Sequence, residues 1–354
     1  MRQRCLRPQP MRRPVHAALL VIPLSVIFSA CGAASIGRVT APRAVKLGRW
    51  TAGASVGRVL DLSGPRRDQT ILVAAAGRLA RLSPGATSAS PFATGAGGYS
   101  SPGGEEPYIA LSAGTRARGA GCTFGTDALY ALRLKNGTGF TVVSPGGSAH
   151  RFARLGGHGL ESGIAFDDTG RFGHRLLVTV TLGSKTTVDA LDCHGAVTAI
   201  THDAPRVEGG IAVAPATFGR FGGDLIAPDE HSGRIYAISP DGRCQLVGDS
   251  GLPHGADLGV ESAGFVPAGF GVGGKALVAD RLTPGNPHPG DDVVLSLGAA
   301  TLKAAGVRTG DLLIASEGGA RTDAISCTST CRVRYVADGP SVAHAEGHIV
   351  FTTG

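Results

Sequence analysis

Glutamates recur five times along the chain at the head of a short apolar phrase, such as Glu-Ser-Gly-Ile-Ala-Phe or Glu-Gly-Gly-Ile-Ala-Val. If these phrases are equivalent strands of one repeated unit, their carboxylates gather at one end of the assembly, where like charges destabilise one another. A bound divalent cation with oxygen ligands, calcium or magnesium, would offset that repulsion. The candidate metal ligands are Glu106, Glu161, Glu208, Glu261 and Glu346.

Histidines lie close to several of these glutamates. His158 and His254 precede the second and the fourth of them, and His344 and His348 flank Glu346. A facing histidine and glutamate can transfer protons near neutral pH, so His344 and Glu346 are the candidate catalytic residues. The alternative is structural: each glutamate hydrogen-bonds the backbone of the neighbouring unit and only marks the repeat.

The spacing of the phrases indicates a repeated architecture. The glutamates are 55, 47, 53 and 85 residues apart, and internal repeats of this order are typical of a chain built from one supersecondary unit. The last interval is close to two periods, which predicts a unit without its glutamate. Short β-rich runs follow each phrase, for example Arg234-Ile-Tyr-Ala-Ile, and they are too short for helices. The sequence therefore predicts an all-β fold, a β-propeller of short antiparallel strands.

Six units can be counted by their strand runs. They lie near residues 57–90, 106–150, 161–202, 208–250, 261–298 and 300–338. No unit follows the final phrase, Glu346–Phe351, so we expect it to be the innermost strand of the N-terminal unit. Pairing the last strand with the first unit removes an open sheet edge. We therefore predict six blades over residues 57–354, closed by the C-terminal strand.

The first 30 residues have the pattern of a secretory signal peptide. Five arginines precede an apolar stretch over 17–28 that is too short to span a bilayer. The following Phe28-Ser-Ala-Cys31 resembles the bacterial lipobox, which implies that Cys31 is lipidated and becomes the mature N-terminus. We expect residues 31–56 to form a flexible tether, in an exported protein anchored on the extracytoplasmic side of the bacterial cell membrane. Ordinary cleavage and secretion is the alternative.

Charge excludes one class of partner. Removing the leader leaves 29 basic and 27 acidic residues, so there is no clustered basic face of the kind that nucleic-acid binding requires. We expect a monomer that meets the membrane through its lipid anchor and binds an unidentified protein or small molecule.

Cysteines provide candidate disulfides, because an exported chain folds in an oxidising compartment. Cys327 and Cys331 would close a small loop across a turn. Cys193 and Cys244 occupy similar places in successive repeats and form the second candidate pair. With Cys122 the number is odd, so one thiol remains or pairs elsewhere.

Two phrases carry a resemblance to known propellers. Glu208-Gly-Gly-Ile-Ala-Val and Leu225-Ile-Ala-Pro-Asp-Glu-His-Ser-Gly-Arg-Ile-Tyr-Ala-Ile resemble blades of the SMP-30/gluconolactonase-like and NHL-like group, over roughly residues 57–354. The lactonases of that group are metal enzymes in which a glutamate, an asparagine and an aspartate hold a divalent cation. This chain has only Asn136 and Asn286, and neither lies in a predicted channel strand. In streptogramin lyases histidine and glutamate surround magnesium, and His344-Ala-Glu346 is similar to that pattern.

Such a fold carries many unrelated functions, so the resemblance indicates architecture more than activity. We expect a lipoprotein of the cell envelope whose propeller is a binding or scaffolding module with a cation at its axial channel. The alternative is a metal-dependent lactonase-like hydrolase or lyase, and the sequence leaves open whether the chain is an enzyme.

Overall fold

The computed structural model describes residues 46–101, 107–133, 139–156, 159–255 and 257–353. Within these ranges the chain is built from short β-strands, with one short α-helix, α1 (Ala299–Ala304), and one 3-10 turn, η1 (Gly219–Phe221). The predicted all-β class is confirmed. No helix in the described ranges is long and apolar enough to cross a membrane.

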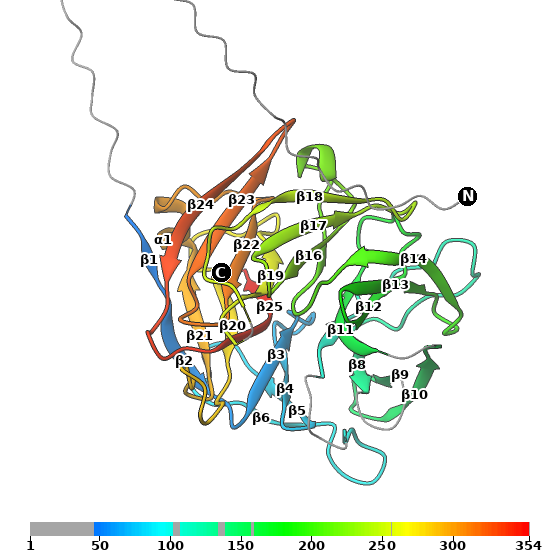
Figure 1. Ribbon diagram of the computed structural model, residues 1–354. Coiled ribbons are helices and arrows are strands. Elements are labelled where there is room, and N and C mark those ends of the chain that lie inside the picture. The colour runs from blue at the N-terminus through cyan, green and yellow to red at the C-terminus, as the bar shows by residue number, and fades with distance from the viewer. Residues whose placement is uncertain (1–45, 102–106, 134–138, 157–158, 256, 354) are drawn as a thin grey trace, which may run out of the picture.

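Sixteen of the strands form four separate antiparallel sheets, each made of four strands that are consecutive in the chain (Figure 1). The sheets are β3 (Val59–Ser63), β4 (Ile71–Ala75), β5 (Arg78–Leu82) and β6 (Ser90–Phe92); β7 (Ile109–Leu111), β8 (Leu129–Arg133), β9 (Gly139–Val143) and β10 (Ala149–Arg154); β11 (Leu160–Phe166), β12 (Leu176–Leu182), β13 (Lys185–Leu191) and β14 (Val197–Pro205); and β15 (Ala212–Val213), β16 (Leu225–Asp229), β17 (Arg234–Ile238) and β18 (Cys244–Asp249).

The remaining strands form one nine-stranded sheet with two halves. A single parallel residue pair, Ala263 with His348, joins the halves. The first half contains β19 (Val260–Phe265), β22 (Leu312–Ser316), β23 (Thr322–Cys327), β24 (Cys331–Asp338) and β1 (Gly48–Arg49), and the second contains β25 (Ala345–Thr352), β20 (Lys275–Asp280), β21 (Val293–Gly298) and β2 (Thr51–Ser55).

The two halves are interleaved along the chain, which corrects the predicted units 261–298 and 300–338. Strand β19 pairs with β22, whereas β20 pairs with β25. The chain thus leaves β19 for β20 and β21 in the other half, and returns to β22 afterwards. Two groups of strands lie between the last two glutamate phrases, so the 85-residue interval reflects this crossing. Local spacing carries no information on which distant strand completes a sheet.

Ring closure also differs from the prediction. Strand β25 is not the inner strand of the N-terminal unit, because that unit has its own first strand, β3, and β25 pairs with β20. Strand β2 lies at the outer edge of the same half, so both ends of the described chain contribute a strand to it. The predicted tether is therefore wrong over residues 46–56. Trp50, between β1 and β2, is 1% exposed, and its indole N–H donates to Thr322 Oγ1 at 2.7 Å.

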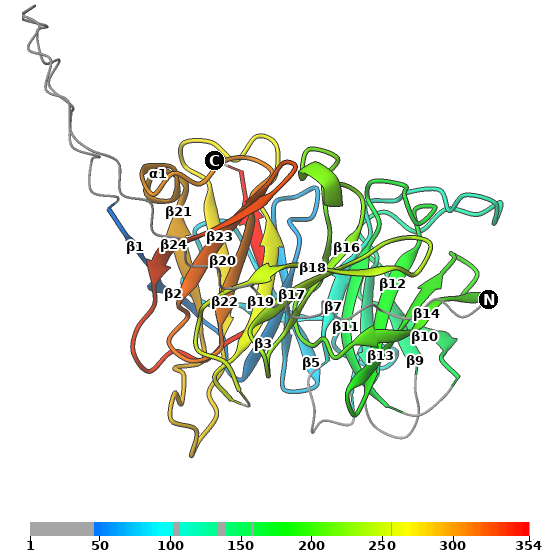
Figure 2. The ribbon, with the colours of Figure 1, turned by 45° about the horizontal axis from the view of Figure 1, so that its top comes forward.

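The first strands of the sheets lie side by side around a common axis, which gives a propeller-like arrangement (Figure 2). Their order is β3, β7, β11, β15, β19 and β25, and β25 contacts β3 in turn. Glycine lets these strands crowd together. The N–H of Gly210 donates to the Glu261 carbonyl at 2.7 Å, and a Cβ on Gly210 would lie 2.4 Å from the carbonyl oxygen of Gly347.

A buried ion pair lies where these strands meet. The carboxylate of Asp61 on β3 accepts from the backbone N–H groups of Leu62, Ile109 and His348 at 2.7–2.8 Å. Its oxygens both lie 3.0 Å from Nδ1 of His348. Nε2 of His348 lies 2.9 Å from the carbonyl oxygen of Ile164 on β11. Because a carbonyl only accepts, Nε2 carries a proton, and the ring is an imidazolium that links three sheets.

The environment of His348 supports this charge state. Burial alone would lower the pKa of His348, but the Asp61 carboxylate and the hydrogen bonds around the ring outweigh it and raise the pKa. Gly347 is required beside this pair, because its φ is +68° and a Cβ there would lie 2.2 Å from Asp61 Oδ1.

Replacing Asp61 tests this pair. Asp61→Asn leaves the imidazolium of His348 buried without its counter-charge, so we expect the free energy of unfolding to fall by about 3–5 kcal/mol. Denaturant unfolding followed by circular dichroism measures the change. The exposed Asp249 provides the control, since Asp249→Asn should stay within about 0.5 kcal/mol of the wild type. Equal stabilities for the two variants would contradict the role assigned to Asp61.

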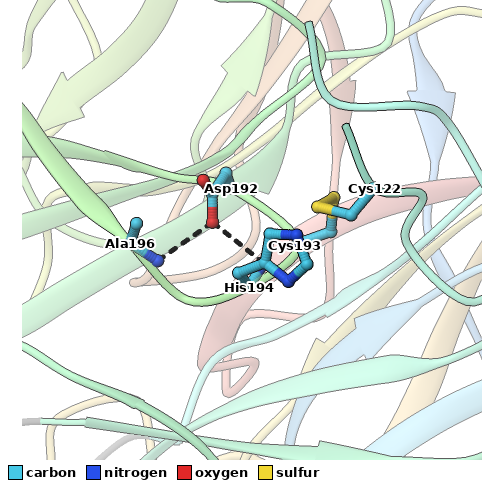
Figure 3. The surroundings of a disulfide bond; sticks show 5 residues. All are labelled: Cys122, Asp192, Cys193, His194 and Ala196. Atoms are coloured by element: carbon cyan, nitrogen blue, oxygen red, sulfur yellow. Dashed lines mark hydrogen bonds between the residues drawn. A yellow bond between two sulfur atoms is a disulfide. The ribbon is translucent and has the colours of Figure 1, made fainter. Parts of the chain in front are cut away.

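The disulfides agree with the prediction in one of two cases. Cys327 and Cys331 are bonded, as expected. Cys193 is bonded to Cys122, not to Cys244 (Figure 3). The turn that carries Cys193 is fixed by Asp192, whose Oδ1 accepts from the backbone N–H groups of His194 and Ala196 (Figure 3). The repeats place Cys193 and Cys244 at similar positions in different sheets, and equivalent positions need not be neighbours.

Candidate functional site

The structure brings together only part of the predicted carboxylate ring. Glu261 and Glu346 lie near the starts of β19 and β25, and Glu208 precedes β15. Glu161 has a different environment, since its Oε1 accepts from the backbone N–H of Gly139 on β9 at 2.6 Å. That contact matches the structural interpretation of the glutamate phrase. Glu106 and His158 lie outside the described residues.

Three buried side chains form a compact cluster of potential metal ligands: Glu317, His344 and Glu346. Each offers one ligand atom, and these atoms all lie within 4.8 Å of one another. His344 Nε2 is 2.6 Å from Glu317 Oε1 and 3.2 Å from Glu346 Oε1. The three side chains are at most 6% exposed, so the cluster is shielded from solvent.

Glu317 enters the cluster because its backbone is held between two inner strands. Its N–H donates to the carbonyl of Gly259 at 2.6 Å, just before β19. Its own carbonyl accepts from the N–H of Ala345, the first residue of β25, at 2.9 Å. The interleaving of the two halves brings the end of β22 to the start of β25, and the cluster forms where they meet.

His344 is oriented by its second nitrogen. Nδ1 lies 3.0 Å from the carbonyl oxygen of His288, in the segment between β20 and β21, so Nδ1 carries a proton and Nε2 faces the two glutamates. Burial alone would lower the pKa of His344, but the hydrogen bonds to Glu317 and Glu346 outweigh it and raise the pKa to about 10. The backbone N–H of His344 also donates to Asp280 Oδ1 at 2.8 Å, which fixes the backbone at this position.

The imidazolium of His344 and the guanidinium of Arg281 offset the charges of the two carboxylates of the cluster. Arg281 Nη1 donates to Glu346 Oε1 at 2.9 Å. Burial would raise the pKa of Glu346, but the hydrogen bond from His344 and the charge of Arg281 lower it. Burial and the neighbouring Glu346 raise the pKa of Glu317, against the effect of His344. In the described chain, Oε2 of Glu317 and Oε2 of Glu346 are buried without a hydrogen-bond partner. Two such oxygens beside one imidazole leave room for a further positive ligand.

A second group of charges lies near the cluster. Arg206 Nη2 is 2.5 Å from Glu208 Oε2 and 3.7 Å from Glu230 Oε2. Glu230 Oε1 accepts from the backbone N–H of Asp257 at 3.0 Å. The charges of Glu317 and Glu346 act on Glu208, so the two groups form one electrostatic unit. We call the whole set, Arg206, Glu208, Glu230, Glu261, Arg281, Glu317, His344 and Glu346, the carboxylate mouth.

Glu230 is an acid of the carboxylate mouth whose pKa is raised far above its ordinary value. Burial first, and then the charges of Glu317 and Glu208, raise the pKa of Glu230 from 4.5 to about 8. Between these two pH values the folded chain holds a proton that the unfolded chain has released. The folded state therefore loses stability as the pH rises through this window.

A neutral isostere at position 230 tests this effect. Glu230→Gln does not titrate, so its free energy of unfolding should rise relative to that of the wild type, by up to about 1.4 kcal/mol per pH unit between pH 5 and 8. Urea unfolding at several pH values measures the difference. The exposed Asp203 serves as the control, because Asp203→Asn should show a difference that is independent of pH. The same flat profile for Glu230→Gln would show that Glu230 is ionised throughout.

Sequence reasoning missed Glu230 and Glu317. Both follow the second strand of a sheet, after β16 and β22, and Asp280 ends β20 in the same way. In an antiparallel pair the end of the second strand lies beside the start of the first, so these acids arrive at the end where the glutamate phrases begin. The sequence does contain a signal for these acids, because each of the two strand runs ends in a glutamate: Leu225-Ile-Ala-Pro-Asp-Glu and Leu312-Leu-Ile-Ala-Ser-Glu.

His344 and Glu346, the candidate catalytic residues, lie in the cluster but are 1% and 0% exposed. The other two predicted histidines have separate roles: His348 belongs to the ion pair with Asp61, and His254 lies beside Gly233. The arrangement is suited to holding a small ion more than to contacting an organic substrate directly.

Comparisons with known proteins leave the family open. No protein-family model matches the chain, and no curated protein matches it. Among solved structures, a protein of unknown function from Bacteroides thetaiotaomicron is similar at 12% identity and a TM-score of 0.45, over 84% of this chain and 64% of that one.

Two further solved structures are similar at the same level. A putative TolB from Agrobacterium tumefaciens shares 14% identity at a TM-score of 0.44, over 85% of this chain and 91% of that one. A catalytically inactive virginiamycin B lyase from Staphylococcus aureus, solved with quinupristin, shares 14% identity at a TM-score of 0.41, over 74% of this chain and 78% of that one. Likenesses this weak carry no inference about function.

Proposed function

We propose that the chain is a binding module whose carboxylate mouth holds a divalent cation through Glu317, His344 and Glu346. The observation that carries the proposal is the pair of buried carboxylate oxygens without a partner, beside a histidine whose Nδ1–H is fixed on a backbone carbonyl. Metal-binding histidines are usually oriented by such a hydrogen bond. Nε2 of His344 then binds the ion in place of the proton that it shares with the two glutamates.

The ligand atoms of the cluster, two carboxylates and one imidazole nitrogen, indicate which ion it prefers. Two carboxylates suit calcium and magnesium, the ions expected from the sequence. An imidazole nitrogen suits manganese and zinc better, because these metals accept mixed nitrogen and oxygen ligands. We therefore expect manganese or zinc to bind more tightly than calcium or magnesium. When bound, the ion supplies positive charge that ties the end of β22 to the start of β25.

Isothermal titration calorimetry with each of the four ions tests the cation site. The wild type should bind one ion per chain, and Glu317→Gln should lower the affinity by at least about tenfold. Glu230→Gln is the matched control, because Glu230 lies outside the three-residue cluster and its raised pKa keeps it protonated at neutral pH. The substitution therefore removes no charge, and the affinity should stay within about threefold. Absence of binding at millimolar ion, or equal affinities for the two variants, would overturn the proposal.

The burial of His344 and Glu346 favours a binding role over the alternative, a lactonase-like hydrolase or lyase.

We further propose that the propeller has six blades, with each half of the nine-stranded sheet counted as one. Six hydrophobic clusters in the described residues support this number, and each combines residues of two neighbouring strand sets. Leu62 and Leu277, for example, share one cluster between the first set and the last.

We also propose that the module is exported and anchored to the bacterial cell membrane through a lipid on Cys31, on the basis of the leader pattern. Detergent phase partitioning of the protein expressed in a bacterium tests the anchor. The wild type should enter the detergent phase and Cys31→Ala should stay in the aqueous phase, because the acyl chains supply the membrane affinity. Identical partitioning of the two proteins would favour plain secretion.

A further inference from the structure

A cavity of about 540 Å³ lies at the end of the nine-stranded sheet opposite the carboxylate mouth. Strand β19 carries Glu261 near its start, at the mouth, and Val266 directly follows its end, in the cavity wall. The other walls come from the segment between β19 and β20 and from α1 with the loop that follows it. Helix α1 lies near the C-terminal end of β25 (Figure 2). This site is therefore separate from the cation cluster.

The floor of the cavity is apolar. Val266, Leu302 and Val307 are 3%, 1% and 6% exposed and belong to the core cluster shared by the two halves of the sheet. Phe270 forms one wall and packs edge-on against Phe351, with ring centroids 5.2 Å apart. A pocket of this volume with an aromatic wall has the size and polarity of a small-molecule site.

Two exposed cations, Lys303 and Arg308, line the same cavity, and no acidic residue does. Across the described residues, neither side chain takes part in an ion pair or a hydrogen bond. The nearby acid Asp311 is already engaged, because Arg334 Nη2 lies 3.3 Å from its Oδ2. Asp311 also balances part of the charge of Arg308. An apolar floor below two exposed positive charges is complementary to a ligand with an apolar tail and an anionic head.

Val272 adds apolar surface beside this cavity. It lines the opening and is 91% exposed, so it extends the apolar lining of the cavity to the surface. We propose that the cavity binds the acyl chain of an anionic amphiphile, a fatty carboxylate or an anionic phospholipid. The tail lies on Val266, Leu302 and Val307, and the head group meets Lys303 and Arg308.

Fluorescence titration with dansylaminoundecanoate, an anionic fatty-acid probe, tests the site. The full chain is used with Cys31→Ala, so that no lipid anchor competes. We expect saturable binding of one probe, displaced by dodecanoate and not by dodecyltrimethylammonium. The double variant Lys303→Glu/Arg308→Glu should weaken binding by at least about tenfold, since attraction becomes repulsion at two positions. Lys275→Glu, an exposed lysine outside the cavity lining, should bind as the parent does.

Co-sedimentation with vesicles separates the two sources of amphiphile. Binding to phosphatidylglycerol vesicles but not to phosphatidylcholine vesicles, lost in the double variant, identifies membrane lipid; probe binding without vesicle binding identifies a free fatty acid. No saturable binding in either assay, displacement by the cationic amphiphile, or equal binding by the double variant and Lys275→Glu would overturn the proposal. Circular dichroism establishes that each variant is folded.

Discussion

The ion pair between Asp61 and His348 is the interaction on which the ring depends. It brings β3 against β25, the last strand of the chain, and through the Ile164 carbonyl it also holds β11. A charge pair so deeply buried is stable only when every donor and acceptor around it is used, and here three backbone N–H groups and one carbonyl complete it. Gly347 lets the carboxylate approach. His348 also pairs with Ala263 on β19, so the ion pair holds β25 beside β19. Glu261 and Glu346 of the carboxylate mouth lie near the starts of these two strands.

The fold class could be predicted because it depends on local signals. Short β-rich runs, glycine turns and a repeated phrase indicate antiparallel strands wherever they occur, and the first strands do lie around one axis. The pairing of β19 with β22 and of β25 with β20 depends instead on contacts between residues far apart in the chain. No local pattern distinguishes Leu312-Leu-Ile-Ala from Ala276-Leu-Val-Ala as the partner of the Glu261 phrase. For the same reason the composition of residues 46–56 suggested a tether, although Trp50 is buried against Thr322.

Only part of the candidate site could be predicted from the sequence, and the reason is again the long-range pairing of the strands. His344 and Glu346 are neighbours in the chain, so their meeting needs no knowledge of the fold. Glu317 meets them because the interleaved halves bring the end of β22 to the start of β25. Glu161 was predicted as a metal ligand because it heads a glutamate phrase, but its carboxylate instead accepts a hydrogen bond from the backbone of Gly139. A repeated glutamate is thus a structural element in one sheet and a candidate ligand in another, and the difference lies in what surrounds it.

The central claim is that the carboxylate mouth holds a divalent cation between two strands that the chain reaches by crossing. Anomalous diffraction from crystals soaked in manganese tests it most directly, because the anomalous signal comes from the ion itself. The account predicts one strong anomalous peak at about 2.0–2.3 Å from Glu317, His344 and Glu346. Well-ordered density for these three side chains with no peak between them, at a manganese concentration of several millimolar, would contradict it.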